Sequence, residues 1–479
     1  MGNEGLTYKT KKGIIWSSIE RFGTQGIQFV FSIILARLLS PSDYGIIAMP
    51  MIFLALAQVI IDSGFANALI RKPDLNEDDL STAFYFNIIV GCVCYFILYA
   101  FSPLIADFYE TPILSSVLKI TALSTLFNPL CIVQQTILTI KIDFKSQARI
   151  SVISYVLGGL LGIYMAYQGY GVWALVVSQT LSSLLRVVLL WSITGWRPKS
   201  RWSKESFKYL WGLGSKLMLS GILECIYQNI YTMIIGKFYT KDNLGYYTRA
   251  HNFAQLPSTN IYGVIRRVTL PILSSIQNDE ERLVGAFCRI LRVSVFVIFP
   301  MMIGLVGIAE PLVRVILSDK WLPSVPLLQI LSIAMMWIPI DALNLSLLMV
   351  KGRSDLFLHL EIIKKVVGAL ILILTIKQGL NVICYGYCAY CIFEIISDTY
   401  YTGKFYGIGL LRQIVIMMPT GLLSLTMLLI ILVLNKLVND PYIQLSVGVL
   451  SASSFYYLVG RFSGMKEYGE LIAFIKAKR

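Results

Sequence analysis

Charged side chains are scarce in this sequence. Only 14% of the residues are Asp, Glu, Lys or Arg, whereas soluble domains carry roughly 25%. Hydrophobic residues make up 56%, and apolar stretches recur along the chain with only short polar breaks between them. This composition excludes an ordinary water-soluble domain and predicts a membrane protein with many spans.

Catalytic signatures are missing as well. The sequence contains no Walker A loop, no HExxH and no GxSxG, and the breaks between apolar stretches are too short to house a catalytic loop. All eight Cys fall inside apolar stretches, which argues against a disulfide framework and for small packing residues. We therefore expect no enzyme activity, no metal site and no bound cofactor other than a coupling Na⁺ or H⁺.

The apolar stretches predict an all-α polytopic fold with about fourteen transmembrane helices, since each is long enough to cross a bilayer and none alternates like a barrel strand. The first stretch is too long for a signal-peptide core and is not followed by a cleavage site, so we expect a retained first helix. The predicted spans are 13–39, 44–65, 81–105, 113–139, 147–167, 171–193, 210–236, 245–273, 283–308, 322–349, 356–376, 380–401, 411–434 and 442–460.

Basic residues predict the orientation, because Lys and Arg are retained on the cytoplasmic side. By our assignment about 25 of the 41 Lys and Arg lie in the even-numbered loops and the two ends, and about 7 lie in the opposite loops. Both termini are therefore predicted to be cytoplasmic. Anionic lipid headgroups account for the net charge of +14 without a nucleic-acid partner.

An internal repeat organises the chain. Residues 28–45 align with 228–245, pairing Gln28 with Gln228 and Gly45 with Gly245, and later matches follow at a shift of about 210, such as Lys141 with Lys351. Because each copy holds six helices, both copies insert with the same orientation. The sequence thus predicts two parallel six-helix lobes, with boundaries at 1–196, a basic linker 197–208, 209–403, and two extra helices with a basic tail at 404–479.

Polar residues inside the spans predict a hydrated cavity between the lobes, because each buried charge would cost roughly 2.5–3.5 kcal/mol facing lipid. They recur at spacings of three and four on the first and seventh helices, and continue on the second and eighth. Their cationic groups suit an anionic headgroup such as a phosphate or pyrophosphate. Buried ion pairs that hold the lobes together are the alternative. The candidates are Glu20, Arg21, Thr24, Gln28, Asp62, Lys216, Glu224, Gln228, Arg249, His251, Asn252 and Gln255.

Further charges lie late in the second lobe. Glu361, Lys364 and Lys365 have the spacing of an intrahelical ion pair. Glu394 and Asp398 lie one turn apart on the twelfth helix and could hold a coupling cation or proton. An ion pair within the helix is favoured for Glu361, Lys364 and Lys365. For Glu394 and Asp398, both a structural role and a coupling-ion role stay open.

Residues 33–87, together with GYGVWALV at 169–176, resemble polysaccharide exporters of the multidrug/oligosaccharidyl-lipid/polysaccharide (MOP) flippase superfamily, in the O-antigen and colanic-acid-exporter-like branch. The resemblance implies a V-shaped pair of lobes that moves a polyprenyl-diphosphate-linked oligosaccharide across the bacterial inner membrane by alternating access. It implies that cationic residues of the first and eighth helices contact the diphosphate, where Arg21 and Arg249 are the candidates, and that helices 411–434 and 442–460 hold the lipid tail. It also offers Glu224, Glu361, Glu394 and Asp398 as counterparts of a coupling-ion site.

Two alternative functions and one protein partner stay open at this point. A multidrug or metabolite antiporter of the MATE type shares the superfamily, but it favours an anionic cavity. A membrane polysaccharide polymerase or ligase needs a long outward loop, and no outward loop here exceeds roughly a dozen residues. Polysaccharide polymerase or export machinery would be the protein partner of a flippase.

Overall fold

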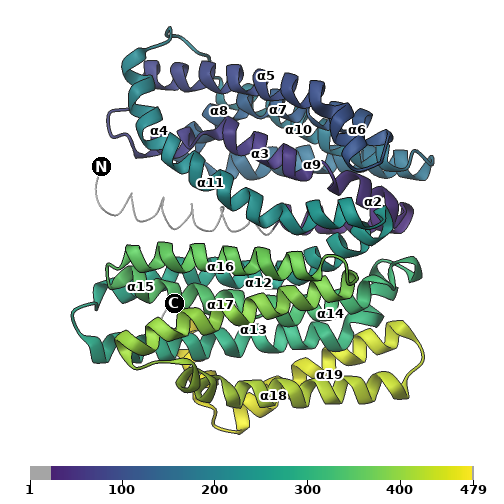
Figure 1. Cartoon of the computed structure of the whole chain (residues 1–479), viewed down its shortest axis with the longest axis vertical. Coiled ribbons are helices and arrows are strands. Elements are labelled where there is room, and N and C mark those ends of the chain that lie inside the picture. Colours follow the sequence, from purple (N-terminus) through teal and green to yellow (C-terminus); the bar gives the residue numbers. More distant parts are fainter. Residues whose placement is uncertain (1–22, 477–479) are drawn as a thin grey trace. The chain divides into compact units, whose positions relative to one another are not determined.

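Two compact units make up the protein, residues 1–245 and 246–479. The computed structural model describes residues 23–476, and this part is helical almost throughout (Figure 1). The predicted Glu20 and Arg21 lie outside the described residues. The all-helical class predicted from the sequence is confirmed.

Unit 1 begins with helical residues 23–38 and continues through α2 (Pro41–Ala48), α3 (Met51–Asp62), α4 (Phe65–Arg71), α5 (Glu77–Phe108), α6 (Ile113–Thr121), α7 (Ser124–Phe127), α8 (Pro129–Ile140), α9 (Phe144–Tyr167), α10 (Val172–Thr194) and α11 (Lys204–Phe238). Its core lies where α4, α5, α8 and α11 meet, around Phe65, Phe84, Val133 and Leu210. Helix α11 packs along α3, α4 and α5 (Figure 1). The lobe boundary that the repeat places at 197–208 stays a prediction.

Helix α12 (Lys241–Ser275) leads from the first unit into the second. Unit 2 continues with α13 (Glu280–Ile316), the 3₁₀ turn η1 (Asp319–Trp321), α14 (Ser324–Met335), α15 (Ile338–Val350), α16 (Ser354–Thr375), α17 (Leu380–Tyr406), α18 (Leu410–Leu437), α19 (Pro441–Phe462) and α20 (Lys466–Lys476). Helix α13 packs against α14, α18, α19 and α20. It is therefore the central helix of this unit.

Several helix ends repeat between the two halves of the sequence. Ser40 and Thr240 each accept a hydrogen bond from the backbone N–H three residues later, as helix N-caps do. The fourth predicted span of each repeat, 113–139 and 322–349, is broken in the middle. After each break the helix resumes with a proline in its first turn, Pro129 in α8 and Pro339 in α15. The repeat inferred from sequence is thus visible in where helices begin.

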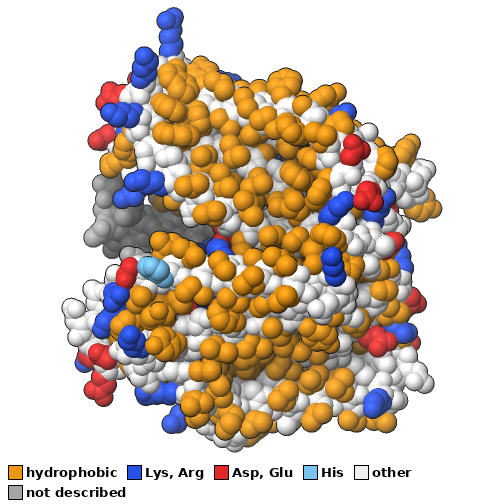
Figure 2. All heavy atoms as spheres, viewed as in Figure 1, with side chains coloured by type: hydrophobic (Ala, Val, Ile, Leu, Met, Phe, Trp, Pro, Cys, Tyr) orange, Lys and Arg blue, Asp and Glu red, His pale blue; other side chains and the backbone are white. Residues whose placement is uncertain are grey.

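The outer surface suits a bilayer. Within the described residues, nine helices are long and apolar enough to cross a membrane, and the bent pair 113–127 and 129–140 makes ten if it counts as one span. On the face drawn in Figure 2, hydrophobic side chains cover the middle of the helices and charged ones gather toward their ends. The protein is a multi-pass membrane protein, and the count of fourteen spans stays a prediction.

Short polar motifs fix the connections. Asn76 and Asp79 form a capping box at the start of α5, and Lys72 reaches back to Asp79 at 2.7 Å. The basic linker is held against the same helix, because the Ser200 and Ser203 N–H groups donate to the hydroxyls of Ser81 and Thr82. The linker is therefore docked on α5.

Candidate functional site

A line of polar side chains runs along α11. Lys216, Ser220, Glu224 and Gln228 follow one another at intervals of four and are all exposed, and Gln228 Nε2 donates to Glu224 Oε1 at 2.7 Å. Exposed polar groups in the middle of a membrane protein must face water or polar partners, because lipid offers neither. We call these four residues the α11 stripe, and its chemistry suits a polar ligand.

The predicted residues at the start of α12 divide into two kinds. Arg249 is buried, and its guanidinium lies 5.9 Å from the ring of the fully buried Trp321. His251 packs against the Tyr247 ring at 5.7 Å. Asn252 and Gln255 are exposed instead. The structure therefore fixes the two basic side chains by aromatic packing and leaves the two amides at the surface.

The remaining predicted residues of the first half are placed as follows. The Thr24 hydroxyl oxygen is buried, Gln28 is exposed, and Asp62 is half-buried at the last residue of α3. Immediately after Asp62 the chain turns through left-handed backbone at Ser63 and Gly64. The second predicted span is therefore interrupted directly beyond its carboxylate.

A buried cluster of charges joins α15, α16 and α17. Lys364 Nζ lies 2.8 Å from Asp341 Oδ1 and 2.7 Å from Asp398 Oδ2, and its side chain is only 1% exposed. Glu361 lies 3.7 Å from the same nitrogen and 3.4 Å from Lys365 Nζ. The intrahelical pairing of Glu361 with the two lysines is therefore confirmed, and two further carboxylates from neighbouring helices join it.

The other predicted acid of this region stands beside that cluster. Glu394 on α17 accepts a hydrogen bond from the Tyr390 hydroxyl one turn earlier and lies one turn before Asp398 on the same helix. Two of the four residues named as a coupling-ion site, Glu361 and Asp398, thus contact Lys364 directly, and Glu394 is their neighbour. Glu224 lies on α11 in the other unit.

A second polar contact set fastens α18 to the helices of this cluster. Gln413 Nε2 donates to Asn344 Oδ1 at 2.7 Å, and Thr402 Oγ1 donates to the same oxygen at 3.2 Å. All three side chains are fully buried. Satisfied amide networks of this kind hold helices in one register where hydrophobic packing alone would let them slide.

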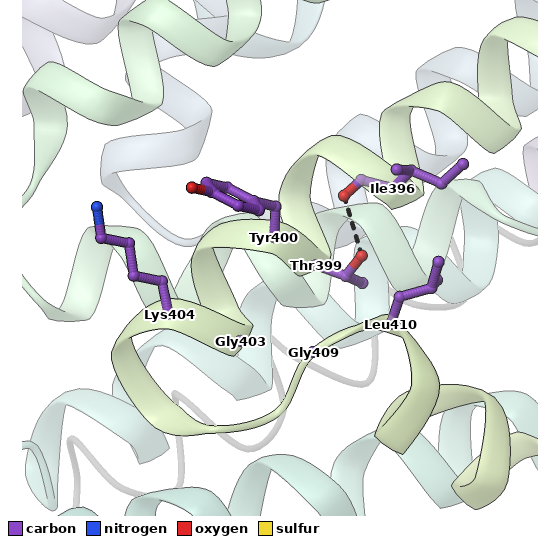
Figure 3. Close-up of a pocket in the computed structure, with 7 residues that line it drawn as sticks. All are labelled: Ile396, Thr399, Tyr400, Gly403, Lys404, Gly409 and Leu410. Atoms are coloured by element: carbon purple, nitrogen blue, oxygen red, sulfur yellow. Dashed lines mark hydrogen bonds between the residues drawn. The ribbon is translucent and has the colours of Figure 1, made fainter.

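An open hollow lies at the corner between α17 and α18, where the close approach of Gly403 to Gly409 lets the chain turn sharply. It encloses about 580 Å³ and is lined by Ile396, Thr399, Tyr400, Gly403, Lys404, Gly409 and Leu410. In Figure 3 the Lys404 and Tyr400 side chains project from α17 at its rim, while glycine backbone forms its floor.

Comparison with known protein families shows where the chain belongs. The family described as polysaccharide biosynthesis protein matches residues 34–326, which is more than half of the chain. The chain belongs to this family. It is a multi-pass membrane protein of this polysaccharide biosynthesis family.

Individual relatives in the family carry related names. The teichuronic acid biosynthesis protein TuaB of Bacillus subtilis is 28% identical over 354 residues, 73% of each chain. The lipopolysaccharide biosynthesis protein WzxC of Escherichia coli is 25% identical over 365 residues, covering 75% of this chain and 73% of WzxC.

Solved structures support the fold. The lipid II flippase MurJ in an inward closed conformation matches with a TM-score of 0.73 at 18% identity, over 93% of this chain and 99% of MurJ. An inward-facing MATE multidrug transporter matches with a TM-score of 0.62 at 14% identity, over 82% of this chain and 98% of that transporter. At such identities the likeness concerns the fold alone. The predicted fold, that of MOP-type transporters, is confirmed.

Sequence reasoning about this polysaccharide biosynthesis protein missed two features. It did not connect the Asp341 carboxylate to Lys364, and it passed over Asn344, Thr402 and Gln413. The sequence does carry a signal for the contact of Asp341 with Lys364, since three successive spans each carry a charge that lipid would not tolerate. The amide network offered no such signal, because a single Asn or Gln in a span has many harmless positions.

Proposed function

We propose that the protein is a flippase that moves a polyprenyl-diphosphate-linked oligosaccharide from the cytoplasmic to the outer leaflet of the bacterial inner membrane. The observation that carries this proposal is the α11 stripe, a line of exposed polar groups along a membrane helix in a chain whose family makes polysaccharides. An extended glycan needs a continuous series of hydroxyl and amide partners, and a stripe of Lys, Ser, Glu and Gln supplies it.

The diphosphate is proposed to pair with Arg21 and Arg249. A guanidinium forks onto phosphate oxygens better than an ammonium does, and Arg249 is already oriented by the Trp321 ring. A preoriented cation loses less conformational entropy when it binds. Asn252 and Gln255, exposed on the same helix, are proposed to exchange hydrogen bonds with sugar hydroxyls.

The lipid tail stays in the bilayer in this scheme and is proposed to lie along α18 and α19. Leu411, Val415 and Leu422 give α18 an exposed apolar face. Alternating access of the two lobes then carries only the polar part across. An inside-negative potential favours outward movement of an anion by about 2.3 kcal/mol per charge per 100 mV.

Deleting the gene and complementing it tests the proposal. Cells without the protein should accumulate one lipid-linked oligosaccharide on the cytoplasmic face, identified by mass spectrometry, and lose the corresponding surface polysaccharide. Arg21→Ala and Arg249→Ala should each lower export at least tenfold at normal expression, whereas Arg282→Ala, at the exposed start of α13, should not.

Two outcomes would contradict it. Normal surface polysaccharide combined with lost drug resistance would favour the antiporter alternative, which the MATE-like fold also accommodates. Normal export by both arginine variants would move the diphosphate elsewhere while leaving the flippase class intact. A role in polymerisation would show instead as flipped but unpolymerised repeat units.

A further inference from the structure

The hollow at the corner between α17 and α18 has apolar walls. Ile396 and Leu410 line it with aliphatic side chains, and the Thr399 hydroxyl donates to the Ile396 carbonyl within its own helix, at 3.1 Å (Figure 3). Gly403 and Gly409 have no side chains to fill it, and a Cβ atom on Gly403 would lie 2.8 Å from the Gly409 Cα atom. The hollow of about 580 Å³ therefore has room for an apolar group.

The exposed face of α17 leads into this hollow. Four exposed side chains follow one another along it at intervals of four, Ile392, Ile396, Tyr400 and Lys404. The helix rises by about 18 Å over these residues, close to the thickness of about 15 Å of one leaflet's hydrocarbon. Aliphatic side chains, then a tyrosine, then an amine match in order the acyl chain, the interface and the headgroup of a lipid.

Three cations gather around the last turn of α17. Lys404 projects at the rim of the hollow (Figure 3). Lys351, from the turn before α16, places its Nζ atom 5.2 Å from the centre of the Tyr406 ring. Arg412, in the first turn of α18, donates from Nη1 to the Gly407 carbonyl at 3.3 Å. The corner therefore collects positive charge from three separate segments of unit 2.

The acidic residues closest to these cations in the sequence are engaged elsewhere. Asp398 is fully buried against Lys364, at 2.7 Å, and Asp355 pairs with Arg353, also at 2.7 Å. Glu280, exposed at the start of α13, pairs with none of the three cations. Within the described residues the three cations thus form no ion pair, and their charge is available to an anionic ligand.

We propose that the hollow binds an anionic phospholipid, with its phosphate among Lys404, Arg412 and Lys351 and one acyl chain against the apolar walls. Charge complementarity selects an anionic headgroup over a zwitterionic one, because basic side chains at a membrane surface attract anionic lipids. The Tyr406 ring and the Gly407 carbonyl already hold two of the cations, so less conformational entropy is lost on binding.

Such a lipid would fasten the corner. Its headgroup would join the end of α17, the start of α18 and the turn before α16, beside the buried contact of Gln413 with Asn344. A ligand that binds only the folded state raises its stability, so the lipid should stabilise unit 2. This inference goes beyond the proposed function and does not depend on it, because the transported lipid is placed along α18 and α19.

Photocrosslinking of the purified full-length protein in phosphatidylcholine nanodiscs tests the site directly. The probe is phosphatidylglycerol with a photoreactive group on one acyl chain, and labelled residues are located by mass spectrometry. Label should concentrate on residues 392–410. A phosphatidylcholine probe with the same photoreactive group should instead label the lipid-facing helices evenly. The same pattern from both probes would mean ordinary contact with bulk lipid and would overturn the proposal.

Competitors identify the ligand. Unlabelled phosphatidylglycerol should remove the label, whereas inorganic phosphate should not, because it has no acyl chain for the hollow. Displacement by inorganic phosphate would mean a surface site for free anions and would overturn the proposal. Displacement by a polyprenyl diphosphate at lower concentration than phosphatidylglycerol would assign the hollow to the transported carrier. That result would overturn this proposal while supporting the proposed function.

Variants locate the contacts. Lys404→Gln and Arg412→Gln should each lower the labelling about fivefold, whereas Lys436→Gln, exposed in the last turn of α18, should not. Leu410→Trp should fill the hollow and lower the labelling, whereas Leu425→Trp, exposed on the same helix outside the hollow, should not. Unchanged labelling in both Lys404→Gln and Arg412→Gln overturns the proposal. The competition experiment on the wild-type protein decides alone if these variants do not fold.

Thermal unfolding measures the effect of the bound lipid. The wild-type protein should unfold at a higher temperature in nanodiscs of equal parts phosphatidylglycerol and phosphatidylcholine than in phosphatidylcholine alone. The double variant Lys404→Gln with Arg412→Gln should lose most of this gain, and Lys436→Gln should keep it. An equal gain in the double variant and the wild-type protein would place the stabilising lipid elsewhere and overturn the proposal.

Discussion

Gly45 and Gly245, which the internal repeat pairs with each other, pack reciprocally at the starts of α2 and α12. A Cβ atom on Gly45 would overlap the Lys241 carbonyl, and one on Gly245 would overlap the Pro41 carbonyl. All four residues lie in unit 1. Each glycine therefore faces the first turn of the opposite helix, and at this crossing α2 and α12 meet through backbone rather than side chains.

Adding a methyl group at this crossing is expected to be costly. Gly45→Ala or Gly245→Ala must push a rigid backbone carbonyl aside, so each should lower the free energy of unfolding by about 1–3 kcal/mol, despite the higher helix propensity of alanine. Gly285→Ala is the control, since a Cβ there meets nothing within 4 Å. Thermal unfolding of the purified variants measures the difference. Stability equal to that of Gly285→Ala would mean that the helices can separate freely at this point.

The helices were largely predictable because hydrophobic length is a property of the sequence alone. Every predicted span from 44–65 onward coincides with helical segments. The breaks within spans were not predicted, although proline marks the helix start after two of them, Pro129 in α8 and Pro339 in α15. The break at Ser63 and Gly64 was hidden because the apolar run continues through α4. Helix α20 was missed because it is short and lies beyond the last apolar stretch.

Site residues were harder to predict because their roles depend on packing between helices. Periodicity placed Lys216, Glu224 and Gln228 on one face of a helix, and all three are exposed there. It could not tell that Arg249 packs against Trp321, a residue some seventy positions away in a 3₁₀ turn. Spacing within one helix is visible in a sequence, whereas the contacts of that helix with others are not.

Reversing charge on the α11 stripe should impair export. Lys216→Glu places two like charges two turns apart, next to Glu224, on a surface proposed to bind an anionic substrate, and we expect at least a tenfold loss of surface polysaccharide. Lys208→Glu is the matched control, because Lys208 is exposed on the same helix but lies outside the stripe. Equal export by the two variants at equal expression would show that the stripe does not contact substrate.

The docked linker gives a third prediction. Thr82→Val keeps the shape of a fully buried side chain but removes the acceptor for the Ser203 N–H. Amides 200–206 should then exchange hydrogen roughly fivefold faster, consistent with the loss of about 1 kcal/mol for one hydrogen bond. Thr180→Val should leave these rates unchanged, because Thr180 bonds only to Val176 in its own helix. Unchanged exchange in Thr82→Val would mean that the linker is held by other contacts.

Glu110 offers a pH-dependent prediction in a loop outside the spans. Its hydrogen bond to Lys237, at 2.9 Å, and the charge of that ammonium lower the pKa of the Glu110 carboxyl below its ordinary value. The pair therefore contributes fully above the ordinary carboxyl pKa, and its contribution is lost as pH falls through the lowered value. Lys237→Met should return the Glu110 titration, followed by carbon NMR of labelled glutamate, to the ordinary range. An identical titration in both proteins would show that the pair does not persist in solution.

Helix α20 should depend on one ion pair for its docking. Glu470 accepts two hydrogen bonds from Arg292 on α13, at 2.6 and 3.0 Å, and both side chains are mostly buried. Glu470→Gln weakens this charge-assisted fork by about 1–2 kcal/mol, so amides of 466–476 should exchange five- to thirtyfold faster. Arg289→Gln should change little, because Arg289 lies 3.9 Å from Glu470 and is mostly exposed. The charge-swapped double variant Arg292→Glu with Glu470→Arg should restore the protection of these amides. Equal hydrogen-exchange rates in Glu470→Gln and Arg289→Gln, or no restoration in the double variant, would show that hydrophobic packing rather than this pair holds α20 on α13.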